Sequence, residues 1–323
     1  MPEPLVDVHL TPTDLKAALR DDVYAGLLAT PKELPPKWFY DERGSELFAE
    51  ITRLPEYYPT AREAEILERF APEMAQRPVK TFIELGAGSA EKTRWLLDAL
   101  IPNSDLERYV PFDVSEDFLR AVAAGLASEY PDLSVHAVVG DFERHLDALP
   151  GEHPRLVALM GGTIGNFRPG ERKGFLSQIG DHMIDGDWFL LGTDLVKDRA
   201  RLEAAYNDSQ GVTAEFNRNV LHVVNRELGA DFVPDRFEHI ACWDESNEWI
   251  EMRLRSIERQ KVHVGALGLE VSFAAGEEMR TEVSAKFRRE GVTAELADAG
   301  MRLVHWWTDA AADFAVSLSN LRQ

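Results

Sequence analysis

The segment "FIELGAGSAEKT" (residues 82–93) runs an apolar, strand-like pattern into two glycines and then into charged helix-forming residues. In an open α/β sheet, a glycine turn after a strand lets the backbone approach a ligand at the carboxyl ends of the strands. We therefore predict that Gly86 and Gly88 border a cofactor site. A dinucleotide fingerprint would need a third glycine three residues later, and Glu91 stands there instead, where it would repel a pyrophosphate. This pattern disfavours NAD.

Five apolar runs extend outward from this turn and alternate with amphipathic helical patterns, which is typical of βαβ units and a parallel sheet. The predicted strands cover residues 80–85, 108–114, 134–139, 155–160 and 187–193. The last segment, 300–321, reads as two strands around a polar turn and predicts an antiparallel hairpin that closes the sheet. Five parallel strands with such a hairpin resemble the Rossmann-like α/β sheet of class I S-adenosylmethionine (SAM) methyltransferases.

Two parts of the chain, residues 1–60 and 196–285, depart from this rhythm. Helical patterns at 12–28, 44–54 and 202–228 are joined by alternating strand patterns between 248 and 275. We therefore expect a SAM-binding domain built from 61–195 and 286–323. A second, α+β substrate domain from 1–60 and 196–285 would act as a lid. Thr60 and Glu63 have the spacing of a capping box at the start of the helix that enters the first domain.

Composition limits the possible partners. The 323 residues include 35 Lys+Arg and 56 Asp+Glu, a net charge of -21 that repels nucleic acid and anionic membranes. The single cysteine, Cys242, excludes an internal disulfide and multi-cysteine metal sites, and we expect it to be a small buried hydrophobe. No basic, apolar leader and no run of about 18 apolar residues is present. We expect a cytoplasmic monomer without a metal, since the nine histidines show no close ligand spacing.

Candidate cofactor ligands follow the predicted strands. Glu84 completes "ELGAG", which is similar to the E/D-x-G-x-G motif of SAM methyltransferases. Asp113 is placed to accept hydrogen bonds from ribose hydroxyls, although it could simply begin a helix. Asp141 and Phe142 could bind the adenine amino group and ring, or form a plain turn. Lys92 could pair with the cofactor's carboxylate, or be a solvated helix lysine.

Candidate substrate ligands lie after the fourth strand and near residue 283. In "MGGTIGNF" (160–167), Asn166 offers an amide that could hold an α-carboxylate, or it is an ordinary loop residue. Glu282 and Ser284 are two residues apart, so in extended backbone their side chains share one face and could bind both nitrogens of an imidazole. Alternatively, Ser284 could cap a helix that enters "SAKFRR", with Glu282 in solvent.

Longer motifs give a more specific resemblance. The segments "PPKWFYDERGSELFAEITRLPEYYPTAREAEIL", "FIELGAGSAEKTR", "GGTIGN" and "FAAGEEMRTEVSAKF" resemble the histidine-specific Nα-methyltransferases of ergothioneine biosynthesis, as does most of the chain from about residue 20 onward. The resemblance implies transfer of three methyl groups, one per SAM, to the α-amine of L-histidine, which gives hercynine. The cofactor positions it implies are Gly86, Lys92, Asp113, Asp141 and Phe142. The histidine positions it implies are Tyr57, Asn166, Tyr206, Glu282 and Ser284, with Gly161, Met252 and Tyr40 nearby.

Methyl transfer from a sulfonium is an in-line displacement, so the enzyme mainly has to align a neutral amine with the methyl carbon. We predict that Asn166 and Tyr206 fix the carboxylate, that Tyr40 or Tyr57 relays the departing proton, and that Glu282 confers specificity. Three alternatives stay open. They are a methyltransferase for another small amine, a nicotinamide dehydrogenase, and a SAM-binding protein without activity.

Overall fold

The computed structural model describes residues 4–88 and 90–322 of the chain. These residues form two compact units. Unit 1 contains the segments up to Thr11, Pro59–Leu195 and the chain from Phe287 onward. Unit 2 contains Pro12–Tyr58 and Val196–Lys286.

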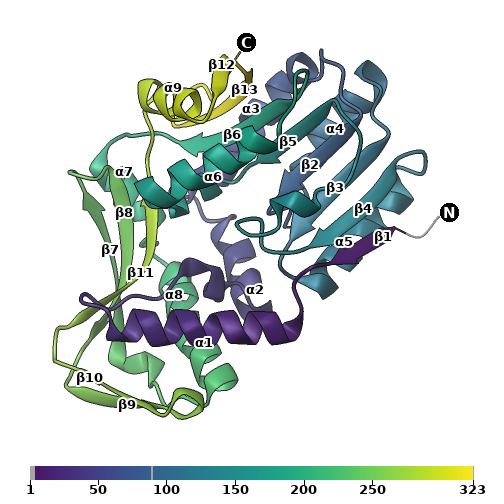
Figure 1. Cartoon of the computed structure of the whole chain (residues 1–323). Coiled ribbons are helices and arrows are strands. Elements are labelled where there is room, and N and C mark those ends of the chain that lie inside the picture. The colour runs from purple at the N-terminus through teal and green to yellow at the C-terminus, as the bar shows by residue number, and fades with distance from the viewer. Residues whose placement is uncertain (1–3, 89, 323) are drawn as a thin grey trace. The chain divides into compact units, whose positions relative to one another are not determined.

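An eight-stranded sheet forms the centre of unit 1 (Figure 1). Its strand order is β1-β4-β3-β2-β5-β6-β13-β12. The first six strands run parallel, and β13 is antiparallel to both of its neighbours. The predicted five strands and closing hairpin are confirmed. The bounds are β1 Leu5–Val8, β2 Thr81–Leu85, β3 Arg108–Asp113, β4 Ser134–Val139, β5 Arg155–Leu159, β6 Trp188–Asp194, β12 Met301–Thr308 and β13 Phe314–Leu321.

The additional strand β1 corrects the expected division of the chain. Residues 1–60 were all expected in the second domain, yet Leu5–Val8 pair in parallel with His136–Val139 of β4. Three of the four β1 residues are exposed because this is an edge strand. A short exposed strand carries little of the apolar alternation from which strands are predicted.

Helices pack on the sheet of unit 1. They are α3 (Tyr58–Met74), α4 (Thr93–Asn103), α5 (Glu116–Glu129), α6 (Pro169–His182) and α9 (Arg289–Asp298). Helices α3, α4 and α5 share one buried apolar cluster with the strands, to which α6 and α9 contribute no residue. Figure 1 shows α6 in front of the sheet and α3 behind it. The strand order reverses at β2, which pairs with β3 on one side and β5 on the other. Ligands bind at such a switch point, outside the carboxyl ends of the strands.

The predicted capping box of α3 is wrong. The helix already begins at Tyr58, so Thr60 and Glu63 both lie inside it. The Glu63 carboxylate is fully buried and accepts hydrogen bonds from the backbone of Gly161, far along the chain. Glu63 therefore binds the loop that follows β5 and does not cap its own helix.

Unit 2 combines helices with two small antiparallel sheets. Strands β7 (Phe237–Asp244), β8 (Trp249–Ser256) and β11 (Glu278–Ala285) form a sheet in the order β11-β8-β7. Strands β9 (Gln260–Val264) and β10 (Leu269–Phe273) form a hairpin. The helices are α1 (Pro12–Leu28), α2 (Glu42–Ile51), α7 (Arg199–Ala205) and α8 (Val212–Leu228). Their apolar side chains and those of β8 belong to one buried cluster, separate from that of unit 1.

The long helix predicted at 202–228 is two helices, α7 and α8. The chain turns between them because the Asp208 carboxylate accepts hydrogen bonds from the backbone nitrogens of Gln210, Val212 and Thr213. Gly211, with φ of 77°, then starts α8. Asp readily forms such local bonds, which compete with a continuous helix.

Candidate active site

The glycine turn after β2 has the geometry of a ligand cradle. Gly86 and Gly88 have φ of 71° and 49°, a region that favours glycine. A Cβ atom at Gly88 would meet no atom within 4 Å, and one at Gly86 would meet only Cε1 of Phe142, at 3.8 Å. The space above the turn is therefore open and bordered by an aromatic ring. This arrangement fits the cofactor prediction.

Asp113 ends β3 and holds this turn. Its Oδ2 accepts a hydrogen bond from the Gly88 nitrogen at 3.1 Å, and its Oδ1 accepts one from the Val114 nitrogen at 2.7 Å. Burial raises the pKa of this carboxyl, while the backbone N–H donors of Gly88, Ser115 and Val114 act to lower it. Asp113 therefore connects the turn after β2 to the segment that enters α5.

Glu84 lies inside the sheet and is almost fully buried. Its Oε2 accepts hydrogen bonds from Thr93 Oγ1 at 2.5 Å and from the Tyr109 hydroxyl at 2.6 Å. Burial raises the pKa of Glu84 to about 7. These bonds join the start of α4 to β3, and the predicted contact of Glu84 with the cofactor stays a prediction.

Asp141 and Phe142 follow β4 by two and three residues. Asp141 Oδ1 accepts a hydrogen bond from the Glu143 nitrogen at 3.0 Å, so the segment is a tight turn. The Phe142 ring lies 5.8 Å from the ring of Phe175 and 6.5 Å from that of Phe112. Phe142 is thus held at the edge of an aromatic cluster, beside the Gly86 turn.

Glu63 joins two of the predicted loops. Lys92, just after the glycine turn, donates to Glu63, so the alternative of a solvated lysine is wrong. The Gly161 nitrogen donates to the same carboxylate, at 2.8 Å from Oε1 and 3.0 Å from Oε2. The loops after β2 and β5 therefore meet at one buried carboxylate. The sequence signal was its position on the apolar face of α3, three residues before the buried Ile66.

Asn166 lies on the same loop as Gly161. It ends a single 3-10 turn, Thr163–Asn166, which follows two glycines that both have positive φ. The side chain of Asn166 is partly buried. Its role as a partner of the substrate carboxylate stays a prediction.

The tyrosines predicted for the substrate side all lie in unit 2. The rings of Tyr57 and Tyr206 are 6.2 Å apart and nearly perpendicular. Phe48 links them to the third, since its ring lies 6.0 Å from Tyr57 and 5.5 Å from Tyr40. Tyr206 is buried, whereas Tyr40 is 42% exposed. The structure thus gathers these three residues around one aromatic cluster.

Glu282 and Ser284 lie on β11, so the extended backbone is confirmed and the alternative of a helix N-terminus is wrong. Glu282 pairs with Met252 and Ser284 with Ile250 on β8. The two side chains therefore share one face of the sheet. Met252 is buried in the core of unit 2.

Lys286 adjoins Ser284 and was missed by the sequence prediction. Its Nζ donates to Ser284 Oγ at 2.8 Å and to the Tyr206 hydroxyl at 2.9 Å, and the two oxygens are 2.7 Å apart. Lys286 is only 4% exposed. The signal was the alternation of polar residues at 282, 284 and 286, which continues one strand face by one more position.

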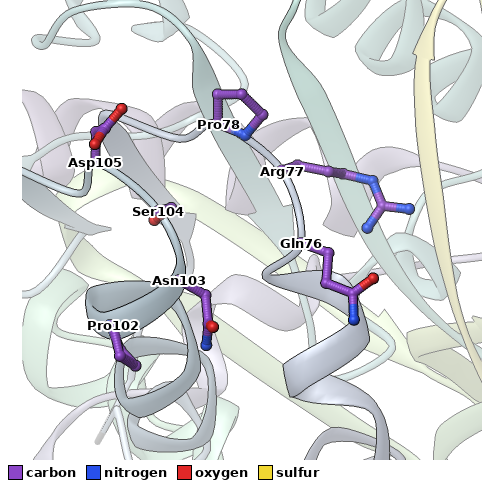
Figure 2. Close-up of a pocket in the computed structure, with 7 residues that line it drawn as sticks. All are labelled: Gln76, Arg77, Pro78, Pro102, Asn103, Ser104 and Asp105. Atoms are coloured by element: carbon purple, nitrogen blue, oxygen red, sulfur yellow. The ribbon is translucent and has the colours of Figure 1, made fainter.

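Other features lie away from these residues. A pocket is lined by residues 76–78 and 102–105, immediately before β2 and β3, and therefore at the opposite strand ends from the glycine turn (Figure 2).

Across residues 4–88 and 90–322, no three His, Cys, Asp or Glu side chains gather as metal ligands. Within the same ranges, no helix has the length and apolar character to cross a membrane. Cys242 is half-buried on β7, so the expectation of full burial is wrong.

The sequence of this chain is similar to those of several known proteins. Residues 19–321 match the family described as "Histidine-specific methyltransferase, SAM-dependent". The histidine N-alpha-methyltransferase of Mycolicibacterium smegmatis is 57% identical over 312 residues, covering 96% of this chain and 97% of that protein. The enzyme of the same name from Mycobacterium tuberculosis is 57% identical over 303 residues, 94% of each chain. Ergothioneine biosynthesis protein 1 of Neurospora crassa is 35% identical over 205 residues, covering 62% of this chain and 23% of that protein.

Proposed function

The chain belongs to the family of SAM-dependent, histidine-specific methyltransferases, and on this premise we propose that it trimethylates the α-amino group of L-histidine. The product is hercynine, and the reaction is the first step of ergothioneine biosynthesis. The observation that carries this function is the 57% identity to two histidine N-alpha-methyltransferases over nearly the whole chain. The strand-end geometry of unit 1 and the polar face of β11 in unit 2 supply chemistry that suits the reaction.

We assign cofactor binding to the strand ends of unit 1. When bound, SAM supplies an electrophilic methyl group on a sulfonium. The open cradle at Gly86, the carboxylate of Asp113 and the ring of Phe142 suit the ribose and adenine of such a molecule. The assigned residues are Gly86, Lys92, Asp113, Asp141 and Phe142.

The ring of histidine is assigned to β11. A carboxylate at Glu282 accepts a hydrogen bond from one ring N–H, and Ser284 is two residues away on the same face. Apolar amino acids are disfavoured there, because they leave the polar groups of the site without partners. Asn166 and Tyr206 are our candidates for holding the substrate carboxylate.

The α-amine needs a free lone pair for in-line attack. The ammonium form of the α-amine has no lone pair, so the amine must lose a proton before it can attack. Tyr40 or Tyr57 then passes the departing proton onward, directly or through water. Aromatic rings also stabilise cations by roughly 0.5–2 kcal/mol, which suits both the sulfonium and the quaternary ammonium product.

The experiment follows histidine and SAM with purified protein, by mass spectrometry of the products. We expect histidine carrying three methyl groups on the α-nitrogen and consumption of three SAM per product. Glu282→Ala should raise KM for histidine roughly 10- to 100-fold, since it removes a hydrogen bond to a charged group, with little change in KM for SAM.

The matched control is Glu270→Ala, at an exposed glutamate of β10 whose side chain pairs with Lys261. This control should behave as the wild type. A wild-type protein that binds SAM but leaves histidine unmethylated would overturn the function. An unchanged KM in Glu282→Ala would overturn only the assignment of Glu282.

A further inference from the structure

A buried histidine of unit 2, His239, binds the backbone of Tyr206. His239 lies on β7, and its side chain is buried. Its Nε2 is 2.8 Å from the carbonyl oxygen of Tyr206, and its Nδ1 is 2.8 Å from Nδ2 of Asn217 on α8. Tyr206 directly follows α7, and carbonyl groups at the end of a helix take their hydrogen bonds from outside the helix. The ring of His239 therefore joins the end of α7 to α8.

The neighbours of Asn217 determine which ring nitrogen of His239 carries the hydrogen. Nδ2 of Asn217 is also 3.1 Å from the carbonyl oxygen of Arg253, which can only accept a hydrogen bond. The amide nitrogen therefore donates one hydrogen to Arg253 and the other to Nδ1 of His239. The amide oxygen accepts from the hydroxyl of Thr281, on β11, at 2.6 Å. Because Nδ1 accepts, the ring hydrogen of His239 lies on Nε2 and is donated to Tyr206.

This arrangement requires a neutral ring. Neutral imidazole has one donor and one acceptor nitrogen, whereas protonated imidazole has two donors and could not accept from Asn217. Burial lowers the pKa of His239, although the hydrogen bond to the Tyr206 carbonyl acts to raise it. Burial therefore favours the form of the ring that binds both neighbours.

We propose that His239 is a positioning residue for substrate binding, which fixes the backbone of Tyr206 so that the Tyr206 hydroxyl stays beside Ser284. This inference rests on the proposed function, which assigns Tyr206 and Ser284 to the substrate. The two hydroxyl oxygens are 2.7 Å apart. Through Asn217, the same chain of hydrogen bonds reaches β11, the strand assigned to the ring of the substrate.

Two substitutions of similar size test this role. His239→Met cannot donate to the Tyr206 carbonyl, whereas the amide of His239→Gln can. We expect KM for histidine to rise about three- to tenfold in the methionine variant, while kcat and KM for SAM stay within about twofold. The glutamine variant should recover most of this loss. Equal KM values for histidine in the two variants would indicate a packing role alone and would overturn the proposal.

A double-mutant cycle tests whether His239 acts through Tyr206. In a Tyr206→Phe background, His239→Met should raise KM for histidine by less than about twofold, because the hydroxyl that it positions is already absent. Fully additive effects would overturn the proposal. His263→Met is the matched control, at an exposed histidine of β9, and it should behave as the wild type.

The position of the ring hydrogen can be observed without turnover. Nitrogen-15 NMR of the imidazole side chains should show a hydrogen on Nε2 and none on Nδ1 for His239, in a signal that is absent from His239→Gln. A hydrogen on Nδ1 of His239 would break the chain of hydrogen bonds and overturn the proposal.

His239→Asn is the second variant if the methionine variant does not fold. Its shorter side chain places an amide near the position of Nδ1, where it binds Asn217 but does not reach Tyr206, so it too should raise KM for histidine. Wild-type turnover of histidine is measured first. Its absence would refute the proposed function and this inference with it, whereas wild-type turnover with equal KM values in the variants would refute only the role of His239.

Discussion

At the scale of single residues, predicted cofactor ligands also form hydrogen bonds that hold the loops at the carboxyl ends of the strands. Asp113 holds the Gly88 backbone, and Glu63 binds both Lys92 and Gly161. Spacing after a strand was enough to make Asp113 a site candidate, whereas Lys92 became one through the family resemblance. Glu63 was misassigned because its partners are 29 and 98 residues away in the sequence, and a local motif carries no information on such contacts.

Asp113→Asn tests the ribose assignment. We expect SAM affinity to fall roughly 10- to 100-fold, because an ionised acceptor is replaced by a neutral amide. Isothermal titration calorimetry with SAM measures the change. Asp132→Asn, at an exposed aspartate of unit 1, is the control and should bind as the wild type. Equal affinities for all three proteins would remove Asp113 from the cofactor site.

The Glu84→Gln variant tests whether burial raises the pKa of this carboxyl group. Its folded pKa of about 7 exceeds the ordinary value of 4.5, so between these pH values the native state holds a proton that the unfolded chain has lost. The resulting stabilisation is complete below about pH 4.5 and is lost as pH rises through about 7. The difference corresponds to about 3 kcal/mol at most. Glutamine does not titrate, so the variant should gain stability relative to the wild type between about pH 5 and about pH 8.

Urea unfolding at several pH values measures this relative gain. The exposed glutamate Glu68 of α3 gives the control variant Glu68→Gln, which should follow the wild type at every pH. If the Glu84→Gln curve ran parallel to that of the wild type across the range, Glu84 would be ionised in the native protein throughout.

At the scale of elements, the sequence predicted the helices and strands whose hydrophobic pattern is strong. The prediction failed where a local contact interrupts an element. The buried strands of unit 1 are continuous apolar runs and were found within two residues. Strand β7 was missed because its burial alternates only over its first three residues and is intermediate beyond them. Strand β11 was expected only as extended backbone around Glu282 and Ser284. The break between α7 and α8 depends on how Asp208 binds the backbone, which helical periodicity does not reveal.

Helix packing gives a prediction for two glycines. Gly125 in α5 is exposed and a Cβ there would meet no atom within 4 Å, so Gly125→Ala should stabilise the protein by about 0.5–1 kcal/mol. Gly180 in α6 differs, because a Cβ there would lie 2.3 Å from the backbone oxygen of Ala299. Gly180→Ala should therefore destabilise the protein by about 1–3 kcal/mol. Chemical denaturation measures both, and the same sign for the two variants would contradict this account of α6 and α9 packing.

At the scale of the whole molecule, the chain divides its chemistry between two units. Unit 1 carries the strand ends assigned to SAM, and unit 2 carries the polar face of β11 assigned to the histidine ring. Alternating strand and helix patterns were enough to predict the large sheet of unit 1 except for its edge strand β1. The alternation at residues 282, 284 and 286 indicates Lys286, but the hydrogen bond from Lys286 to Tyr206 was not predictable, because the two residues are 80 positions apart.

The proposed function is methylation of histidine at its α-amine in preference to the other amino acids. The most direct measurement incubates the purified protein with SAM and an equimolar mixture of the twenty amino acids, without added metal, and analyses every amino acid by mass spectrometry. The account predicts a histidine product heavier by three methyl groups, with the other nineteen unchanged. Methylation of a different amino acid in preference to histidine would contradict it.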